Sequence, residues 1–249
     1  MRQKLYMMAA TVALVMATGR AVADFSALAR IVDSECVPNE QVNGKPSPCA
    51  AVDLGGRYAI LKDLVGASQF LLIASTPEPG IEGTDLEGHS APNYFEEAWK
   101  SRHFMDDQLG RALPRDVVGL AINSIAGRTQ NRFHIHIDCV RADVLQQLKA
   151  DAGSIGTSWT AIPGSLVGHP YRAMRVEAAN LSEINPFALL AADLPQGDDR
   201  MGDQSLVAIA SAMPDGSDGF YLLTDHVGAT PGDMGSGEEL LDHSCEVLK

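Results

Sequence analysis

The sequence is short of basic residues and lacks several patterns that would define its class. Lysine and arginine number 19 against 32 acidic residues, which gives a formal net charge of −13. Nucleic acid and anionic lipid headgroups repel such a chain, so nucleic-acid binding is not expected. No internal repeat, heptad run or low-complexity tract is present, and 45% of the residues are hydrophobic. A compact globular protein is therefore favoured over a solenoid or a fibrous protein.

Long apolar runs are also missing, and the one candidate lies at the N-terminus. Arg2 and Lys4 precede a mostly apolar run at 5–16, and Ala-Val-Ala then precedes Asp24. A transmembrane helix needs about 20 apolar residues, whereas a basic start, a short apolar run and small residues are typical of a secretory signal peptide. Residues 1–23 are thus predicted to be a signal peptide, with an uncleaved N-terminal membrane anchor as the alternative. Cleavage would delete three basic residues and no acid, which makes the charge −16.

Cysteine is scarce, and no Cys-x-x-Cys spacing occurs among the four that are present. An even count in an exported chain predicts disulfides. Cys36 and Cys49 bracket a loop rich in Pro, Gly and Asn and are paired, which leaves Cys139 with Cys245. The second bond would hold the C-terminus against the segment that contains Cys139. A Cys/His metal cluster is the alternative, although the spacing does not support it.

That segment, FHIHIDCV at 133–140, is the most informative stretch of the chain. Side chains alternate between the two faces of a strand, so His134, His136 and Asp138 share one face and the apolar residues share the other. Same-face neighbours lie about 7 Å apart, so the row is long enough to follow a diphosphate. An edge strand with incidental polar residues is the alternative interpretation.

The remaining pattern predicts an α+β protein with an antiparallel sheet and packed helices. The mature chain, 24–249, is expected to form a single domain, with a core at about 55–140 and a C-terminal α/β extension at 141–249. The expected elements are a helix at 25–32, strands at 57–63 and 69–74, a long loop at 76–92, a helix from 93 to 110, and strands at 116–123 and 133–140.

The segment from 121 to 137, AINSIAGRTQNRFHIHI, resembles the signature of the histidine triad superfamily. In that superfamily a strand ending in Asn is followed by a turn with Gly and Gln and then by alternating histidines. More narrowly, the segment resembles bacterial CDP-diacylglycerol pyrophosphatase. The likeness continues in LKD at 61–63, WKSRHFM at 99–105, PGSLVGH at 163–169 and DHSCE at 242–246. It therefore extends over essentially the whole mature chain.

This resemblance implies a histidine-triad-like (HIT-like) fold and hydrolysis of CDP-diacylglycerol to CMP and phosphatidate. It implies that His136 is the nucleophile and forms a nucleotidyl-imidazole, and that His134 binds phosphate oxygens. Substrate contacts are expected from Asn123, Gln130 and Asp63. The expected location is the periplasm or the periplasmic face of the inner membrane, with contact to a membrane surface and a possible homodimer. Neither a cofactor nor a metal is expected.

The chain departs from the superfamily pattern at Asp138, which stands where the third histidine is expected. A carboxylate there could raise the pKa of His136 or fix its tautomer. Phosphatidate is a phosphate leaving group with a second pKa near about 6, by analogy with phosphorylated side chains, and departs without strong acid help. The substitution is therefore compatible with this substrate.

Further candidates are weaker, and two rival functions stay open. Arg128 could neutralise the diphosphate, and His169 in a glycine-rich loop could face the site. The apolar segments at 187–190 and 220–223 could line an acyl groove, although core packing is the preferred interpretation. One rival is a zinc-dependent phosphoesterase that uses His134, His136 and Asp138 as ligands. The other is a non-catalytic nucleotide-binding protein.

Overall fold

The computed structural model describes residues 24–83, 85–88, 92–195 and 200–249. The predicted signal peptide or anchor at 1–23 lies outside these residues. Within the described ranges, no helix combines the length and the apolar character needed to cross a bilayer.

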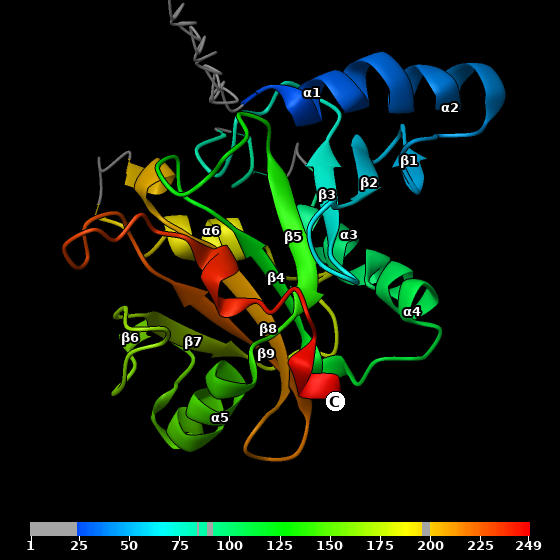
Figure 1. The fold of residues 1–249 in the computed structure, drawn as a ribbon. Helices are drawn as coiled ribbons and strands as arrows, with labels where there is room; N and C mark the ends of the chain where they lie inside the picture. Colours follow the sequence, from blue (N-terminus) through cyan, green and yellow to red (C-terminus); the bar gives the residue numbers. More distant parts are fainter. Residues whose placement is uncertain (1–23, 84, 89–91, 196–199) are drawn as a thin grey trace, which may run out of the picture.

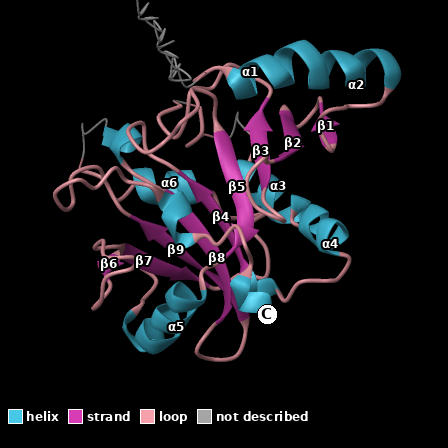
Figure 2. Ribbon diagram, in the orientation of Figure 1, coloured by secondary structure: helices cyan, strands magenta, loops and turns pink. Residues whose placement is uncertain are grey.

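Within the residues that the structure describes, nine strands form one continuous antiparallel sheet, and helices pack on both of its faces (Figures 1 and 2). The sheet order is β1-β2-β3-β5-β4-β8-β9-β7-β6. The strands are β1 (Ala51–Asp53), β2 (Tyr58–Lys62), β3 (Phe70–Ala74), β4 (Val118–Ile122), β5 (His134–Cys139), β6 (Thr160–Ala161), β7 (Arg172–Val176), β8 (Leu206–Ala212) and β9 (Asp218–Thr224). The helices are α1 (Ala27–Ile31), a π-helical turn (Val32–Cys36), α2 (Val37–Asn43), α3 (Tyr94–Ser101), α4 (His103–Leu109), α5 (Ala142–Asp151) and α6 (Pro186–Ala191). Short 3₁₀ turns occur at Arg115–Val117, Ala152–Ser154, Arg200–Asp203, Gly237–Leu240 and Glu246–Leu248.

The two faces of the sheet are covered differently. One face is a single large apolar layer, to which alternate residues of β3, β5, β4 and β8 contribute and on which α3 and α6 pack. On the other face, α1 and the π-helical turn cover β2 and β3 through Leu28 and Val32, while α5 covers β8 and β9 through Val144 and Leu148. Between these two apolar patches lies β5. The opposite face of β5 is therefore the part of the sheet that is left for polar side chains.

The strands predicted for the N-terminal half are confirmed, and the predicted helices are corrected in length. The expected helix at 25–32 continues through the π-helical turn to Asn43, so the segment between Cys36 and Cys49 begins as helix rather than loop. The helix expected at 93–110 is two helices, α3 and α4, with Arg102 at their junction. The ends of the helical region are as predicted. The side chain of Asn93 accepts from the backbone nitrogen of Glu96, and Gly110 adopts the left-handed conformation with φ +66°.

The C-terminal half extends the same sheet. β8 pairs with β4 in a register that places Leu120 opposite Ala208. The mixed α and β content and the antiparallel sheet are thus as predicted. The boundary near residue 140 between a core and an extension stays a prediction.

Candidate active site on the histidine strand

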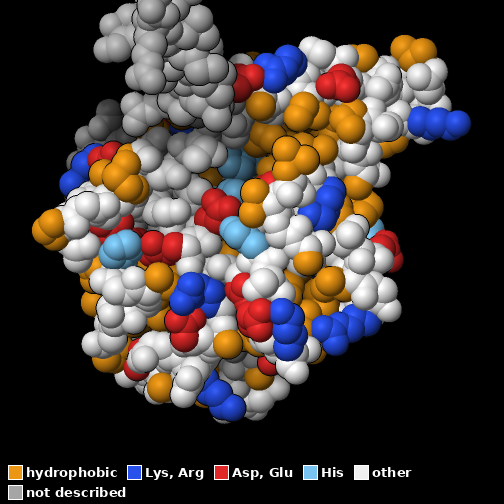
Figure 3. Space-filling view, viewed as in Figure 1, with side chains coloured by type: hydrophobic (Ala, Val, Ile, Leu, Met, Phe, Trp, Pro, Cys, Tyr) orange, Lys and Arg blue, Asp and Glu red, His pale blue; other side chains and the backbone are white. Residues whose placement is uncertain are grey.

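β5 exposes a row of polar side chains toward the uncovered part of the sheet. Ile135 and Ile137 point into the large apolar layer, whereas His134, His136 and Asp138 point to the opposite side. Neighbouring β4 presents small residues to the row, because Ala121 lies opposite His136 and Gly119 lies opposite Asp138. Histidine and acidic side chains gather near the centre of the face seen in Figure 3, next to an apolar patch below α1. The predicted alternation is therefore confirmed, and the strand is internal rather than at an edge.

A pocket of about 540 Å³ opens over this row. One wall is α1 with the strand residues Leu61 and Leu71, and the floor contains His134 and His136. The lining residues are Ala27, Leu28, Ile31, Pro48, Leu61, Lys62, Asp63, Leu64, Val65, Gln69, Leu71, Thr129, Gln130, His134, His136 and Glu238. Apolar residues thus flank one side of a polar floor, an arrangement that is typical of small-molecule sites.

His136 is a buried imidazole with contacts at both nitrogens. Its Nδ1 lies 3.0 Å from Nε2 of Gln69, which also donates to Oδ2 of Asp63 at 2.9 Å. Its Nε2 has no hydrogen-bond partner but lies 3.3 Å from Oε2 of Glu238. Burial lowers the pKa of His136 to about 4, against a smaller raising effect of Asp63. At neutral pH the ring is therefore uncharged and retains a nitrogen lone pair.

His134 is held in one tautomer by the backbone. Its Nδ1 donates to the carbonyl oxygen of Arg132 at 2.7 Å, which leaves Nε2 as the acceptor. Burial and the neighbouring His136 lower the pKa of His134 to about 4. The two rings meet edge to face, with centroids 5.0 Å apart.

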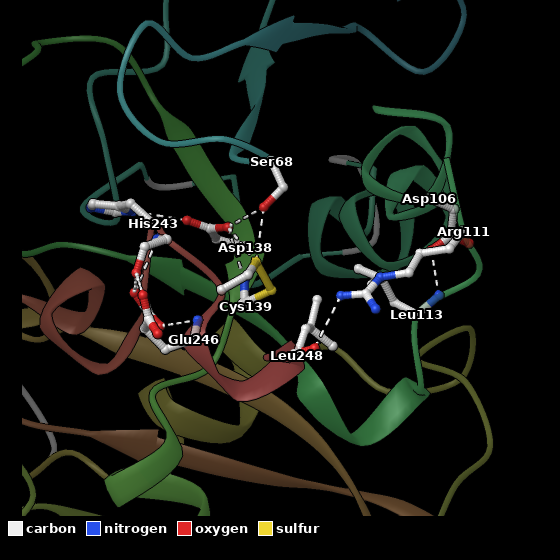
Figure 4. The surroundings of a disulfide bond; sticks show 12 residues. Ser68, Asp106, Arg111, Leu113, Asp138, Cys139, His243, Glu246 and Leu248 are labelled. Atoms are coloured by element: carbon white, nitrogen blue, oxygen red, sulfur yellow. Dashed lines mark hydrogen bonds and ion pairs between the residues drawn. A yellow bond between two sulfur atoms is a disulfide. The ribbon is translucent and has the colours of Figure 1, made fainter. Parts of the chain in front are cut away.

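Asp138 does not bind His136; it binds His243 from the C-terminal segment (Figure 4). His243 Nδ1 donates to Oδ2 of Asp138 at 2.8 Å, while Oδ1 accepts from Ser68 Oγ at 3.1 Å and from the backbone of Cys139 at 2.9 Å. Burial raises the pKa of Asp138, and the Asp138 hydrogen bond raises the pKa of His243. The expected influence of Asp138 on His136 is therefore corrected: the carboxylate orients a different imidazole. Because both of its oxygens are already bonded, the geometry also gives no support to a zinc site that uses Asp138.

The predicted disulfides explain how His243 reaches β5. Cys139 and Cys245 are bonded, as are Cys36 and Cys49. The first bond holds the C-terminal segment next to Asp138, so His243, two residues away from Cys245, lies beside the histidine strand (Figure 4).

Glu238 joins these groups into one network. Its carboxylate faces His136 Nε2 at 3.3 Å and His243 Nε2 at 3.4 Å, and it accepts from Asn123 Nδ2 at 3.2 Å. Asn123 in turn accepts from the backbone nitrogen of Glu238 at 3.0 Å. The predicted residue Asn123 is thus in the site, and Asp63 is connected to it through Gln69.

Three other predicted residues have different surroundings. Arg128 forms an ion pair with Glu82 at 2.7 Å and does not line the pocket. Gln130 lines the pocket, but its amide group binds the backbone of Asp24 and Leu28 at the start of α1. His169 is outside the pocket lining and bonds Glu239 at 2.7 Å. The segments at 187–190 and 220–223 contribute buried side chains to the large apolar layer, as the preferred interpretation held.

Sequence reasoning did not identify Gln69, Glu238 or His243 as parts of the site. A signal for His243 was present, because a bond between Cys139 and Cys245 places residue 243 close to Asp138. No comparable signal exists for Glu238, which reaches Asn123 across 115 positions of sequence.

The site, the disulfides and the sheet belong to a chain that matches a known family along almost its whole length. The family model described as CDP-diacylglycerol pyrophosphatase matches residues 23–249. That range contains every residue of the site described above. The chain therefore belongs to the CDP-diacylglycerol pyrophosphatase family and is a hydrolase that acts on acid anhydrides.

Proposed function

We propose that this protein hydrolyses CDP-diacylglycerol to CMP and phosphatidate through a nucleotidyl intermediate on His136, with a histidine-triad-like arrangement of its site. The observation that carries the proposal is the state of His136. It is a neutral, buried imidazole on the floor of the pocket, and its Nε2 lacks a hydrogen-bond partner. A neutral imidazole in a dry site is the form in which histidine acts as a nucleophile.

Glu238 is the proton acceptor in this proposal. Because Gln69 donates to Nδ1, the ring proton of His136 lies on Nε2, which faces Glu238 Oε2 at 3.3 Å. For the attack, Glu238 takes this proton and passes it to solvent while Nδ1 takes one up, and the unpartnered Oε1 of Gln69 turns to accept from Nδ1. The ring therefore stays neutral, and its Nε2 lone pair attacks the phosphorus that bears cytidine. The bond from that phosphorus to the bridging oxygen breaks, and its electron pair leaves with phosphatidate. Water then attacks the same phosphorus and gives one proton to Glu238, its hydroxyl completes CMP, and the electron pair of the nitrogen–phosphorus bond returns to Nε2. Glu238 then releases its proton to solvent.

The other two imidazoles bind the diphosphate. With its Nδ1 proton bonded to Arg132, His134 presents Nε2 to the pocket and becomes a donor once the bound diphosphate raises its pKa. His243 takes the place of the missing third histidine. Its Nδ1 proton is held by Asp138, and the raised pKa favours the charged ring, whose Nε2 then donates toward the site.

An exposed apolar corner beside the pocket supports a lipid substrate. Leu64 is fully exposed and Val65 is 56% exposed, and both line the pocket. Lys62 lies next to them in the lining. In the proposal, this corner contacts the membrane surface from the exported side, while the acidic remainder of the protein faces away from it.

The test is CMP release from CDP-diacylglycerol in detergent with EDTA present. We expect turnover by the wild type and a loss of at least about 10³-fold in His136→Ala. His103→Ala is the matched control, since His103 is exposed on α4 and its Nδ1 lies 2.9 Å from the carbonyl oxygen of Lys100.

Each alternative gives a different result in this assay. Equal rates in the wild type and His136→Ala would overturn the nucleophile assignment. Wild-type activity that is absent in EDTA and restored by zinc, with the bound zinc lost in His136→Ala, would favour a zinc-dependent phosphoesterase. CMP binding without turnover would favour a non-catalytic nucleotide-binding protein.

A further inference from the structure

A second polar cluster lies behind the segment that carries Glu238. It comprises His169, Asp225, Asp233, Glu239 and the phenol of Tyr171. His169 Nδ1 lies 2.7 Å from Oε1 of Glu239 and 3.9 Å from Oδ2 of Asp233. One ligand atom each from His169, Asp225 and Glu239 lies within 4.8 Å of the others. None of these residues lines the pocket over the histidine strand.

The cluster has more hydrogen-bond acceptors than donors. Oδ1 of Asp225 accepts from the backbone of His226 at 2.7 Å, and Oδ1 of Asp233 accepts from the backbone of Gly235 at 2.9 Å. Oδ2 of each aspartate is buried and has no hydrogen-bond partner. Asp225 is 2% exposed and Asp233 is 3% exposed. A buried carboxylate oxygen without a partner is costly, and two that share one cluster require a positive charge or a proton.

We propose that these residues form a binding site for a divalent first-row metal ion such as Zn²⁺, held by His169, Asp225, Asp233 and Glu239. An imidazole nitrogen together with carboxylate oxygens is a donor set that zinc accepts, whereas calcium and magnesium favour oxygen ligands alone. The two unpartnered oxygens supply the negative charge. Binding replaces the proton on His169 Nδ1, because only the lone pair of that nitrogen can ligate the ion.

The ion would link three residues of the C-terminal segment that completes the active site. Asp225, Asp233 and Glu239 lie on the stretch between β9 and the C-terminus, and Glu238 precedes Glu239 directly. The same stretch bonds to the end of β4, where Ser124 donates from its backbone to Gly235 and from its hydroxyl to Met234. An ion at this place would therefore hold the loop that brings Glu238 to His136, without touching the substrate.

The test measures zinc binding and thermal unfolding, with activity set aside. Full-length protein is stripped with EDTA, exchanged into chelator-free buffer and titrated with Zn²⁺. We expect one zinc per chain by native mass spectrometry. We also expect a rise in Tm on the order of 5 °C when zinc is at about a hundredfold excess over its Kd.

Three variants locate the ion. The isosteric double variant Asp225→Asn/Asp233→Asn should keep its fold and lose both the bound zinc and the shift in Tm. His169→Gln, at a partly exposed position, should weaken binding at least about tenfold and serves if the double variant does not fold. Asp107→Asn, an exposed aspartate on α4, is the control and should bind zinc as the wild type does.

Two results would overturn this inference. The first is a wild type that binds no zinc and shows no zinc-dependent Tm, which would mean that Asp225 and Asp233 share a proton instead. The second is a double variant with undiminished zinc binding, which would place the ion elsewhere. Zinc binding by His136→Ala separates this inference from the proposed function, because that variant should retain the ion whatever its activity.

Discussion

The protein buries two polar clusters, which contain the neighbouring residues Glu238 and Glu239. The clusters differ in the balance between hydrogen-bond donors and acceptors. At the histidine strand, the carboxylates of Asp138 and Glu238 each face imidazole or amide nitrogens. In the cluster around His169, one imidazole and one phenol are the side-chain donors next to three carboxylates, and two carboxylate oxygens have no hydrogen-bond partner. In the first arrangement, burial keeps the His134 and His136 rings neutral, while Asp138 favours the charged form of His243. The second leaves a negative charge that a cation can match.

The largest contrast is expected when an imidazole is removed from the histidine site. His243→Gln should lower the turnover number for CMP release by about 10³-fold, because the charged donor next to the diphosphate is lost. Steady-state CMP release measures this effect. The control His103→Gln should stay within about twofold of the wild type, and a similar loss in both variants would remove His243 from the site.

The pH dependence of stability separates the two clusters further. His134 and His136 have pKa values of about 4 in the folded protein because they are buried, against about 6.5 for an unperturbed histidine. Between pH 4 and pH 6.5 the unfolded chain binds more protons than the folded chain. The contribution of the two histidines to the free energy of unfolding is therefore present above pH 6.5 and is lost as the pH falls toward 4. We expect each of the two rings to contribute about 3 kcal/mol to this change.

Urea unfolding at several pH values between 4 and 7 checks this expectation. The double variant His134→Gln/His136→Gln should show a flatter dependence on pH than the wild type, with the slope as the readout. An unchanged slope would mean that these rings are not the groups that titrate.

The smallest expected effect concerns the acidic cluster in the absence of metal. Burial and the neighbouring Asp233 raise the pKa of Asp225 to about 7, which shows that its charge is unfavourable there. In EDTA at pH 8, Asp225→Asn should therefore raise the free energy of unfolding by about 1 kcal/mol. Asp107→Asn should change it little, and a net destabilisation by Asp225→Asn would contradict the excess of negative charge.

Much of the fold near the histidines was predictable because its signals are local. Alternation over eight residues was enough to assign the face of β5, and Asn93 and Gly110 marked the ends of the helical region. The first helix was predicted too short. Its continuation contains Cys36, which is buried in one apolar cluster with Leu71 and Ile73 of β3, a contact that periodicity in one segment does not reveal.

The candidate site was predictable only in part. His134, His136 and Asp138 were found because they share one strand, and Asn123 and Asp63 were suggested by the family resemblance. Arg128 was assigned to the substrate, yet it lies against Glu82, since a turn residue can point in several directions. His169 was assigned to the same pocket, but the fold places it in the other cluster.

The sequence by itself determined the histidine strand, the faces of its side chains and the pairing of the four cysteines, because these depend on alternation and on counting. The tertiary structure decided which residues complete the site. Gln69, Glu238 and His243 come from β3 and from the C-terminal segment, and only the packed sheet and the Cys139–Cys245 bond bring them to His136 and Asp138. It also decided that His134 and His136 are neutral, because burial is a property of the folded protein.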